Sequence, residues 1–444
     1  MRPKSKFLSF VMILALLLGI AAGCSSGETS SDSGETNEDG ENSGKTNLRI
    51  TWWGSQDRHD KTQEVIKLFE EQNPDIKITA EFTGWDGYWQ KLATQAAGGN
   101  LPDIIQMDYA YLMEYVHRDL IADLNPFVES GVLNLDDVEE AYIEGGYVDD
   151  KLYAVNLGTN ALAMAYDPAM FEKAGVEPFE PGYTWDDYAA AARQLKENLG
   201  DGVYGVEGAK NSLAFFNYFV RQHGEQLYSE DGKSLGFQDD QITIDFLNFW
   251  DALLQDGVAA PPDVVAAVQG RLEEELIVHE KAPTLWFNSN QVVALQSAAG
   301  RELKLAVFPE LPGGEKGLYL KPSQFFSVAK SSKHQEAAAK FIDFVTNNLE
   351  ANEILAAERG VPIAGAVREH LKPTLGEAAL EMFNYVELAE QHASPIYDPE
   401  PAGAGEISGL FDRLAEQLNF GELTAEEFAT QFRAEADKIL AKNE

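Results

Sequence analysis

Residues 48–107 read LRITWWGSQDRHDKTQEVIKLFEEQNPDIKITAEFTGWDGYWQKLATQAAGGNLPDIIQM, and they give the strongest fold signal in the chain. β-Branched, aromatic or alternating apolar residues predict strands at 48–53, 76–82 and 103–107. Both connections have helical character, and Asn73-Pro74 ends the first of them. Strands that alternate with helices over short links predict a parallel sheet with helices on both faces.

The loops that follow these three strands, 54–59, 83–88 and 108–111, are the expected place for a ligand. Parallel strands end at one edge of a sheet, and ligands bind in the crevice outside those carboxyl ends. Neighbouring side chains on a strand point to opposite faces. We therefore expect Trp52 in the core, which leaves Trp53 to face the crevice.

The rest of the chain repeats this mixture of helices and strands. After residue 168 the spacing predicts helices at 185–198, 242–256 and 264–280, strands at 304–309 and 324–328, and mostly helices from residue 334. A chain of 444 residues is too long for one ordinary core and accommodates two domains. We therefore predict an α/β protein with two lobes.

The N-terminal residues predict export and anchoring. Basic residues precede an apolar run at 7–20, so residues 1–23 are predicted to be a signal peptide. Cys24, the only cysteine, follows two alanines and a glycine, and this site resembles the lipobox of bacterial lipoproteins. Residues 24–46 are rich in serine, glycine and acidic residues and predict a flexible tether behind a lipidated Cys24. The alternative is an ordinary signal peptide with a chance cysteine.

Composition argues against several function classes. The formal net charge is −39, whereas binding to nucleic acids or anionic lipids needs a cationic surface. A single cysteine cannot build a cysteine-ligated zinc or iron–sulfur site. The sequence has no G-x-S-x-G turn between a predicted strand and helix, no H-E-x-x-H helix and no phosphate loop. We expect no catalysis, no cofactor and no bound metal.

Several segments, taken in order, resemble the extracellular solute-binding proteins of bacterial carbohydrate ABC importers, the maltose-binding-protein-like family 1. Each segment is weakly specific alone, but their order and spacing are typical of the family. The similarity covers nearly everything from residue 48 to 444. The segments are 48–54, 69–78, 85–92, 98–105, 158–167, 184–188 and 329–337.

This resemblance implies a periplasmic-binding-protein-like fold in which hinge crossings join two α/β lobes. The first lobe would comprise 47–160 plus 327–370, and the second 161–326 plus 371–444. A sugar would bind between the lobes, and the aromatic residues in the loops favour an oligosaccharide. Lobe closure would then present it to the permease of an ABC importer. We expect a monomer, anchored outside the membrane by its lipid, at a Gram-positive surface.

The resemblance also implies which residues contact the sugar. Aromatic rings stack on sugar C–H faces, and planar polar groups bind pairs of hydroxyls. Two alternatives stay open from the residues alone: a binder of another solute such as a metal or polyamine, and a secreted carbohydrate-active enzyme with paired carboxylates. The implied ligand-binding residues are Gln56, Arg58, His59, Trp85, Asp108, Tyr109, Asn160, Phe216, Asn217, Trp286, Asn288 and Gln324.

Overall fold

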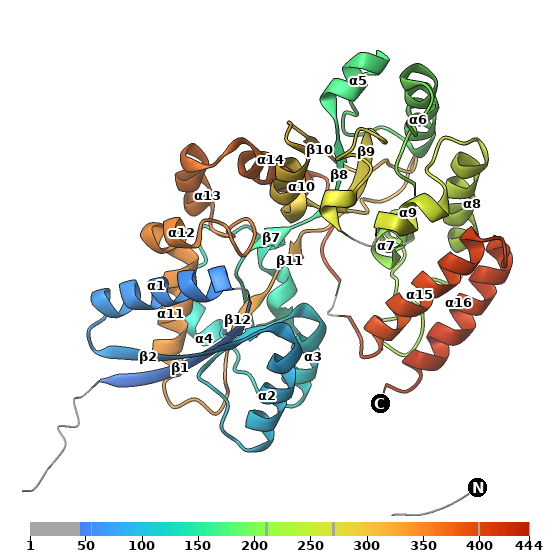
Figure 1. The fold of residues 1–444 in the computed structure, drawn as a ribbon. Helices are drawn as coiled ribbons and strands as arrows, with labels where there is room; N and C mark the ends of the chain where they lie inside the picture. Colours follow the sequence, from blue (N-terminus) through green and yellow to red (C-terminus); the bar gives the residue numbers. More distant parts are fainter. Residues whose placement is uncertain (1–44, 55, 209–211, 269–270, 398–399, 444) are drawn as a thin grey trace, which may run out of the picture. The chain divides into compact units, whose positions relative to one another are not determined.

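The computed structural model describes residues 45–54, 56–208, 212–268, 271–397 and 400–443. The predicted signal peptide, Cys24 and the tether up to residue 44 lie outside the described residues. Residues from Lys45 onward form one compact unit. Its strands form two main sheets, each with its own helices (Figure 1).

Helices and strands alternate along the chain, and helices dominate its last quarter. The strands are β1 (Thr46–Trp53), β2 (Ile76–Thr83), β3 (Ile104–Met107), β4 (Tyr147–Val148), β5 (Lys151–Leu152), β6 (Val155–Asn156), β7 (Thr159–Asn160), β8 (Leu162–Tyr166), β9 (Thr284–Asn288), β10 (Lys304–Ala306), β11 (Lys321–Pro322) and β12 (Phe325–Val328). The α-helices are α1 (Gln56–Gln72), α2 (Trp85–Ala97), α3 (Tyr109–His117), α4 (Asn125–Glu129), α5 (Pro168–Ala174), α6 (Trp185–Leu199), α7 (Leu213–Gln222), α8 (Gln241–Gln255), α9 (Pro262–Val268), α10 (Val292–Ala299), α11 (Gln335–Asn347), α12 (Leu349–Leu355), α13 (Gly365–Leu371), α14 (Glu377–Gln391), α15 (Ala404–Asn419) and α16 (Ala425–Leu440). Short 3₁₀ helices are η1 (Glu140–Tyr142), η2 (Glu144–Gly146), η3 (Leu272–Glu274), η4 (Ser289–Gln291) and η5 (Lys372–Thr374).

The first lobe is built on a five-stranded sheet with strand order β2-β1-β3-β12-β6. β1 pairs in parallel with both β2 and β3, as the strand–helix–strand pattern predicts. β12 pairs antiparallel with β3 and β6, so the sheet is mixed rather than wholly parallel. The difference arises because β12 follows β11 on the return path from the second lobe and enters the sheet from its opposite end.

Alternating side chains along β1 bury both faces of this sheet. Leu48, Ile50 and Trp52 are fully buried in the larger core cluster, on the face where α11 packs. Trp53 belongs to a second cluster together with residues of α2 and α3. Figure 1 shows α1 and α2 on opposite sides of β1 and β2. Trp52 is thus in the core, as expected, and Trp53 is on the other face.

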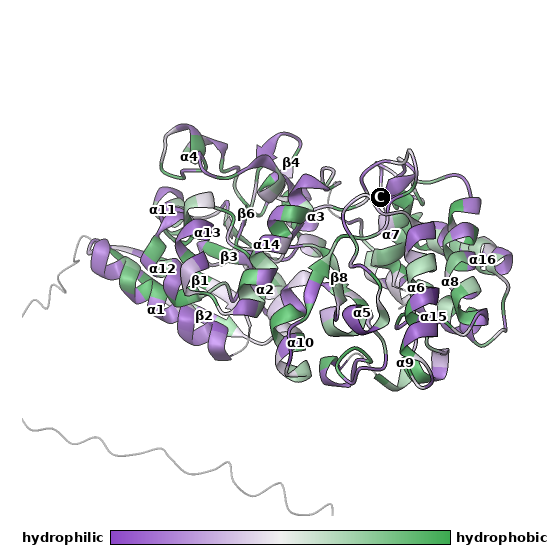
Figure 2. Ribbon diagram, turned by 90° about the horizontal axis from the view of Figure 1, so that it is seen from above, coloured by the Kyte–Doolittle hydropathy of each residue, from purple (hydrophilic) through white to green (hydrophobic). Residues whose placement is uncertain are grey.

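The second lobe is built on a three-stranded antiparallel sheet with strand order β10-β8-β9. α7, α8, α15 and α16 pack on one another in this lobe. In α16, Phe428, Phe432, Ala436 and Leu440 recur every fourth residue and are buried, which is the spacing of an amphipathic helix. Figure 2 shows hydrophobic and hydrophilic residues interspersed along α15 and α16.

Two short strands connect the sheets. β7 and β11 pair antiparallel, with Lys321 opposite Asn160, and Figure 1 shows them between the two main sheets. The chain enters β7 through Gly158, where a Cβ would lie only 2.1 Å from the carbonyl oxygen of Arg359. Only glycine permits this close passage of two backbones. The lobe boundaries implied by the resemblance stay predictions.

Candidate functional site

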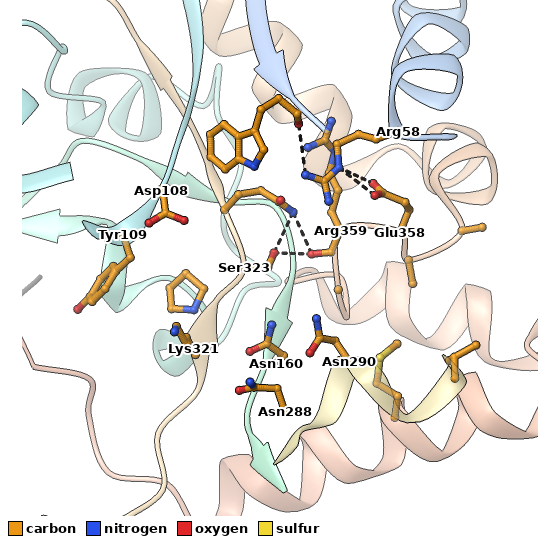
Figure 3. Close-up of a pocket in the computed structure, with 18 of the residues that line it drawn as sticks. Arg58, Asp108, Tyr109, Asn160, Asn288, Asn290, Lys321, Ser323, Glu358 and Arg359 are labelled. Carbon is orange, nitrogen blue, oxygen red and sulfur yellow. Dashed lines mark hydrogen bonds and ion pairs between the residues drawn. The ribbon is translucent and has the colours of Figure 1, made fainter. Parts of the chain in front are cut away.

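A cavity of about 770 Å³ lies where the carboxyl ends of β1 and β3 face β7, β11 and η4 (Figure 3). This volume falls in the range of about 300–1,000 Å³ typical of small-molecule sites. Polar side chains dominate the lining. The polar and aromatic residues that line it are Trp53, Asp57, Arg58, Lys61, Asp108, Tyr109, Asn160, Asn288, Asn290, Lys321, Ser323, Gln324, Glu358, Arg359 and Glu400.

Arg58, in the first turn of α1, is held by an ion pair across the cavity wall. Its Nε donates to both carboxylate oxygens of Glu358, at 2.9 and 3.0 Å. Its Nη1 donates to the carbonyl oxygen of Trp53 at 3.3 Å. Both charged side chains are only 15% exposed, so the pair is better shielded from solvent than a surface salt bridge. This arrangement fixes the guanidinium at the carboxyl end of β1.

Arg359 is buried next to that pair and joins three parts of the first lobe. Its Nη1 donates to Gln106 Oε1 at 2.6 Å, and its Nη2 donates to Thr62 Oγ1 at 2.8 Å. Its carbonyl oxygen accepts from Gln324 Nε2 at 3.1 Å. Burial, together with the nearby charge of Arg58, lowers the pKa of Arg359 to about 9. The residue therefore holds α1, β3 and the start of β12 in one hydrogen-bonded network.

Asp108 and Tyr109 follow β3 and begin α3. The Asp108 carboxylate accepts a hydrogen bond from the Ala110 amide at 3.0 Å and so caps the helix. Burial raises the pKa of Asp108, partly offset by that hydrogen bond and by the positive charge of Lys321. The Tyr109 hydroxyl donates to the carbonyl oxygen of Tyr397. Figure 3 shows Asp108 and Tyr109 across the cavity from Arg58 and Glu358.

Three amide side chains gather at the second-lobe side of the cavity. Asn160 comes from β7, Asn288 from the end of β9 and Asn290 from η4, and Figure 3 shows them close together. Each amide offers a donor and an acceptor in one plane, which suits paired hydroxyl groups. Lys321, on β11, is exposed. Its ammonium makes no hydrogen bond or ion pair with another residue in the described part of the chain.

Charges balance in the cavity although the whole chain is strongly acidic. The net charge of the chain is −39. The formal charges of the lining side chains sum to zero, so the lining as a whole neither attracts nor repels an ion by its net charge. The cations are Arg58, Lys61, Lys321 and Arg359, and the anions are Asp57, Asp108, Glu358 and Glu400.

The structure brings half of the sequence-predicted ligand residues together. They come from the ends of β1 and β3, from β7 and β9, and from the residue before β12. Arg58, Asp108 and Tyr109 lie in the loops predicted after β1 and β3, whereas Asn160, Asn288 and Gln324 were implied by the resemblance and lie at or next to the ends of β7, β9 and β12. These residues are Arg58, Asp108, Tyr109, Asn160, Asn288 and Gln324.

The other residues predicted in the first lobe lie outside the cavity. His59 is buried in the core, where its Nδ1 accepts from Trp52 Nε1 at 3.0 Å, and burial lowers its pKa. It points away because α1 turns it to the face opposite the cavity. Gln56 is exposed and donates to Asp60 Oδ1 at 2.8 Å. Trp85, at the start of α2, is 44% exposed.

The remaining aromatic candidates, in the second lobe, are core residues. Trp286 is 5% exposed and stacks on Phe308 with ring centroids 4.0 Å apart. Phe216 is fully buried and stacks on Phe411 at 5.3 Å. Asn217, next to it on α7, is half-buried and does not line the cavity. The hydrophobic effect places these rings inside because they are large and apolar.

Sequence reasoning missed several residues that line the cavity. Glu358 and Arg359 lie between α12 and α13, in the break before Gly360-Val361-Pro362. Two charges beside a glycine and a proline, after a helix, would have been the available signal. Lys321 and Asn290 carried no such signal, because only the pairing of β11 with β7 and the turn of η4 bring them to the cavity.

The described residues contain neither a metal-binding cluster nor a membrane-spanning helix. No three His, Cys, Asp or Glu side chains in this part of the chain are grouped so that they could hold a metal ion. Among the same residues, no helix has the length and apolar character needed to cross a membrane.

Comparison with known proteins places the chain among binding proteins. A family described as "Bacterial extracellular solute-binding protein" matches residues 54–350. A solved extracellular solute-binding protein family 1 from Alicyclobacillus acidocaldarius is similar with 32% identity and a TM-score of 0.81, covering 89% of this chain and 99% of that one. The arabinooligosaccharide-binding protein of Bacillus subtilis is 25% identical over 369 residues, 79% of this chain and 78% of the relative.

A solved periplasmic oligogalacturonide-binding protein from Yersinia enterocolitica is also similar. It is 25% identical, has a TM-score of 0.76, and covers 90% of this chain and 100% of its own. The family match spans more than half of the chain and agrees with the observed two-lobed fold. The chain therefore belongs to the family of bacterial extracellular solute-binding proteins.

Proposed function

We propose that this protein binds an oligosaccharide in the cavity and delivers it to an ABC importer. The observation that carries the proposal is the lining of the cavity, where amides, carboxylates and guanidinium groups from both lobes converge. Planar groups of this kind bind pairs of adjacent hydroxyls. The volume of about 770 Å³ lies in the upper part of the range of small-molecule sites, which favours several sugar units over one.

The similar proteins support a sugar as the ligand. Two of them are named for arabinooligosaccharides and oligogalacturonides, and both names describe binding rather than catalysis. We infer that this chain is a receptor without enzymatic activity. It works outside the membrane as a monomer, anchored through Cys24 and its tether. Ligand binding shifts the lobes, 47–160 plus 327–370 and 161–326 plus 371–444, towards the closed arrangement that the permease recognises.

Thermal unfolding in the presence of candidate ligands tests this function. The panel holds arabino-oligosaccharides, oligogalacturonides, neutral gluco-oligosaccharides, spermidine and divalent cations. A true ligand at 100 times its dissociation constant adds about 2.7 kcal/mol to the free energy of unfolding, which is a clear rise in Tm. A rise with one oligosaccharide series supports the proposal. A rise with spermidine or a cation alone overturns it.

A cavity variant with a matched control locates the site. Asn288→Ala removes an amide at the cavity, and we expect it to abolish most of the sugar-induced rise in Tm. Asn198→Ala removes an amide that bonds only the carbonyl oxygen of Ala174 in the second lobe, and we expect the ligand-induced rise to stay. An equal loss in both variants would place the ligand elsewhere.

A further inference from the structure

A buried histidine follows Arg58 directly in the sequence but takes no part in lining the cavity. His59 lies in the first turn of α1 and faces the core. Its Nδ1 accepts a hydrogen bond from Nε1 of Trp52 at 3.0 Å. Trp52 belongs to β1 and is fully buried. This bond therefore ties the beginning of α1 to the end of the strand that precedes it.

The bond to Trp52 fixes the protonation state of the His59 ring. An indole N–H can only donate, so Nδ1 is the unprotonated nitrogen and the neutral ring carries its proton on Nε2. A protonated imidazole has no acceptor and would leave the Trp52 indole N–H buried without a partner. Phe82, on β2, stacks on the imidazole with ring centroids 4.4 Å apart. Turning the imidazole out to solvent would therefore break this contact as well.

The surroundings of His59 oppose its protonation. Burial lowers the pKa of His59, and the positive charge of Arg58 lowers it further. Arg359, in the turn between α12 and α13, acts in the same direction. Asp60 on α1 and Glu358 in that turn act in the opposite direction. Protonation would add a cation beside the two guanidinium groups that line the cavity.

The place of the Arg58 side chain depends closely on the position of α1. Its stem folds back over Gly54, where an added Cβ would lie 2.4 Å from Arg58 Cδ and 2.9 Å from its Cβ and Cγ. Its guanidinium then reaches the carbonyl oxygen of Trp53 and the carboxylate of Glu358 (Figure 3). Because the close approach begins at the Cβ of Arg58, a shift of the first turn of α1 would move the whole side chain.

We propose that His59 is a positioning residue for Arg58: its neutral ring, bonded to Trp52, holds the first turn of α1 where the guanidinium lines the cavity. This role deepens the proposed function and rests on it. Sugar binding then requires the neutral imidazole. The ring is neutral at pH 7, because its pKa lies below the ordinary value of about 6.5. As the pH falls through that lowered pKa, the ring gains a proton and the affinity for sugar falls.

Titration calorimetry between about pH 7.5 and about pH 5 tests this role, with the arabino-oligosaccharide or oligogalacturonide that raises Tm as the probe. We expect the wild-type affinity to fall about three- to tenfold across this range. His59→Asn places an oxygen near the position of Nδ1 and cannot be protonated, so it should bind like the wild type at neutral pH and lose less affinity in acid. His59→Gln places its oxygen near the position of Nε2, and it should bind about three- to tenfold more weakly throughout.

A matched control and a spectroscopic signal separate positioning from general damage. His279 is exposed and lies between η3 and β9, so His279→Gln should keep the wild-type affinity and pH profile. Asp108 is present in every variant, so its titration does not affect the comparison. In NMR spectra of the indole N–H groups, the signal lost in Trp52→Phe belongs to Trp52. We expect it to move in acid in the wild type and to stay in place in His59→Asn.

Three results would overturn the role of His59 while sugar binding stands. The first is an equal loss of affinity in acid for the wild type and His59→Asn. The second is wild-type affinity in His59→Gln, and the third is a Trp52 signal that does not move in acid. If neither series of oligosaccharides binds the wild-type protein, the proposed function fails, and the positioning role fails with it.

Discussion

Arg359 shows how a charge inside the first lobe is stabilised without a direct carboxylate bond. Its two donor nitrogens reach the side chains of Gln106 and Thr62, and Glu358 contributes only at longer range. The planar fork of an arginine matches two acceptors that a lysine ammonium cannot reach together. The orientation of the cavity wall therefore depends on the shape of this group as well as on its charge.

Arg359→Lys should lower stability for that reason. One buried acceptor would lose its donor, at a cost of about 1–3 kcal/mol in the free energy of unfolding. Urea unfolding measures the change. Arg413→Lys is the matched control, because Arg413 is exposed and donates only to Gly409 within its own helix. Equal effects of the two substitutions would contradict the role given to Arg359.

Asp108 should make stability depend on pH. Burial raises its folded-state pKa above the unfolded value of about 3.9. Between the two values the folded protein holds a proton that the unfolded chain has released, so stability falls as the pH rises through that window. Lys321 and Glu400 are the charged groups that face it.

Asp108→Asn keeps a helix cap but removes the charge. We expect a higher free energy of unfolding at pH 7 than in the wild type, a flatter pH profile above about pH 4, and weaker sugar binding. Urea unfolding across this range tests it, with the exposed Asp263→Asn as control. A variant that is less stable at pH 7 would show that the charge is favourable.

For single residues, a position at the end of a strand predicts a site residue better than the type of residue does. Asp108 follows the predicted strand β3, while Asn160 at the end of β7 and Gln324 just before β12 were implied by the order of the segments that resemble the family. Trp286 and Phe216 have the right chemistry for stacking on a sugar. Only the packing of β9, α7 and α15 shows that other side chains cover both rings.

One segment between α14 and α15 contacts both lobes. On the second-lobe side, Arg221 Nη2 donates to Ser394 Oγ and to the carbonyl oxygen of Pro395, each at 2.6 Å. The guanidinium also lies 4.1 Å from the ring centroid of Tyr397. On the first-lobe side, Tyr109 donates to the carbonyl oxygen of Tyr397. The segment thus joins a cavity residue to a helix of the opposite lobe.

Arg221 and Tyr109 should therefore be energetically coupled. We expect the double variant Arg221→Lys, Tyr109→Phe to be less destabilised than the sum of the single variants, by about 0.5–3 kcal/mol, because either change alone already loosens the segment. A double-mutant cycle in urea measures this. Replacing Arg221→Lys by Arg413→Lys in the cycle should give additivity. Additivity in the first cycle would show that the segment does not connect the two residues.

Elements were predictable where local pattern decides them. α8 lies within one residue of the range expected from its apolar spacing, and β1 to β3 pair as expected. The predicted helix at 264–280 is wrong, because α9 ends at Val268 and, among the described residues 271–280, only the short η3 is helical. The antiparallel direction of β12 could not be predicted from the sequence either. The direction of a strand depends on the route of the chain through the other lobe and not on local residues.

Anchoring and binding should be separable in the whole molecule. Cys24 lies outside the described residues and is separated in sequence from the cavity by the predicted tether. We expect Cys24→Ser to move the protein from the membrane fraction to the medium while its sugar affinity stays unchanged. Cell fractionation and calorimetry on the released protein measure the two effects. A fall in affinity would show that the anchor contributes to the binding fold.

The charges that line the cavity cancel, whereas the whole chain has a net charge of −39. This difference has a consequence for the rate of ligand association. Long-range fields steer charged ligands and make their association depend on ionic strength. A neutral oligosaccharide should associate at the same rate at low and high salt. An oligogalacturonide carries a carboxylate on each unit, so the acidic surface should slow its arrival, and added salt should speed it. Stopped-flow association of both ligands at two ionic strengths therefore tests whether the acidic surface repels the charged one.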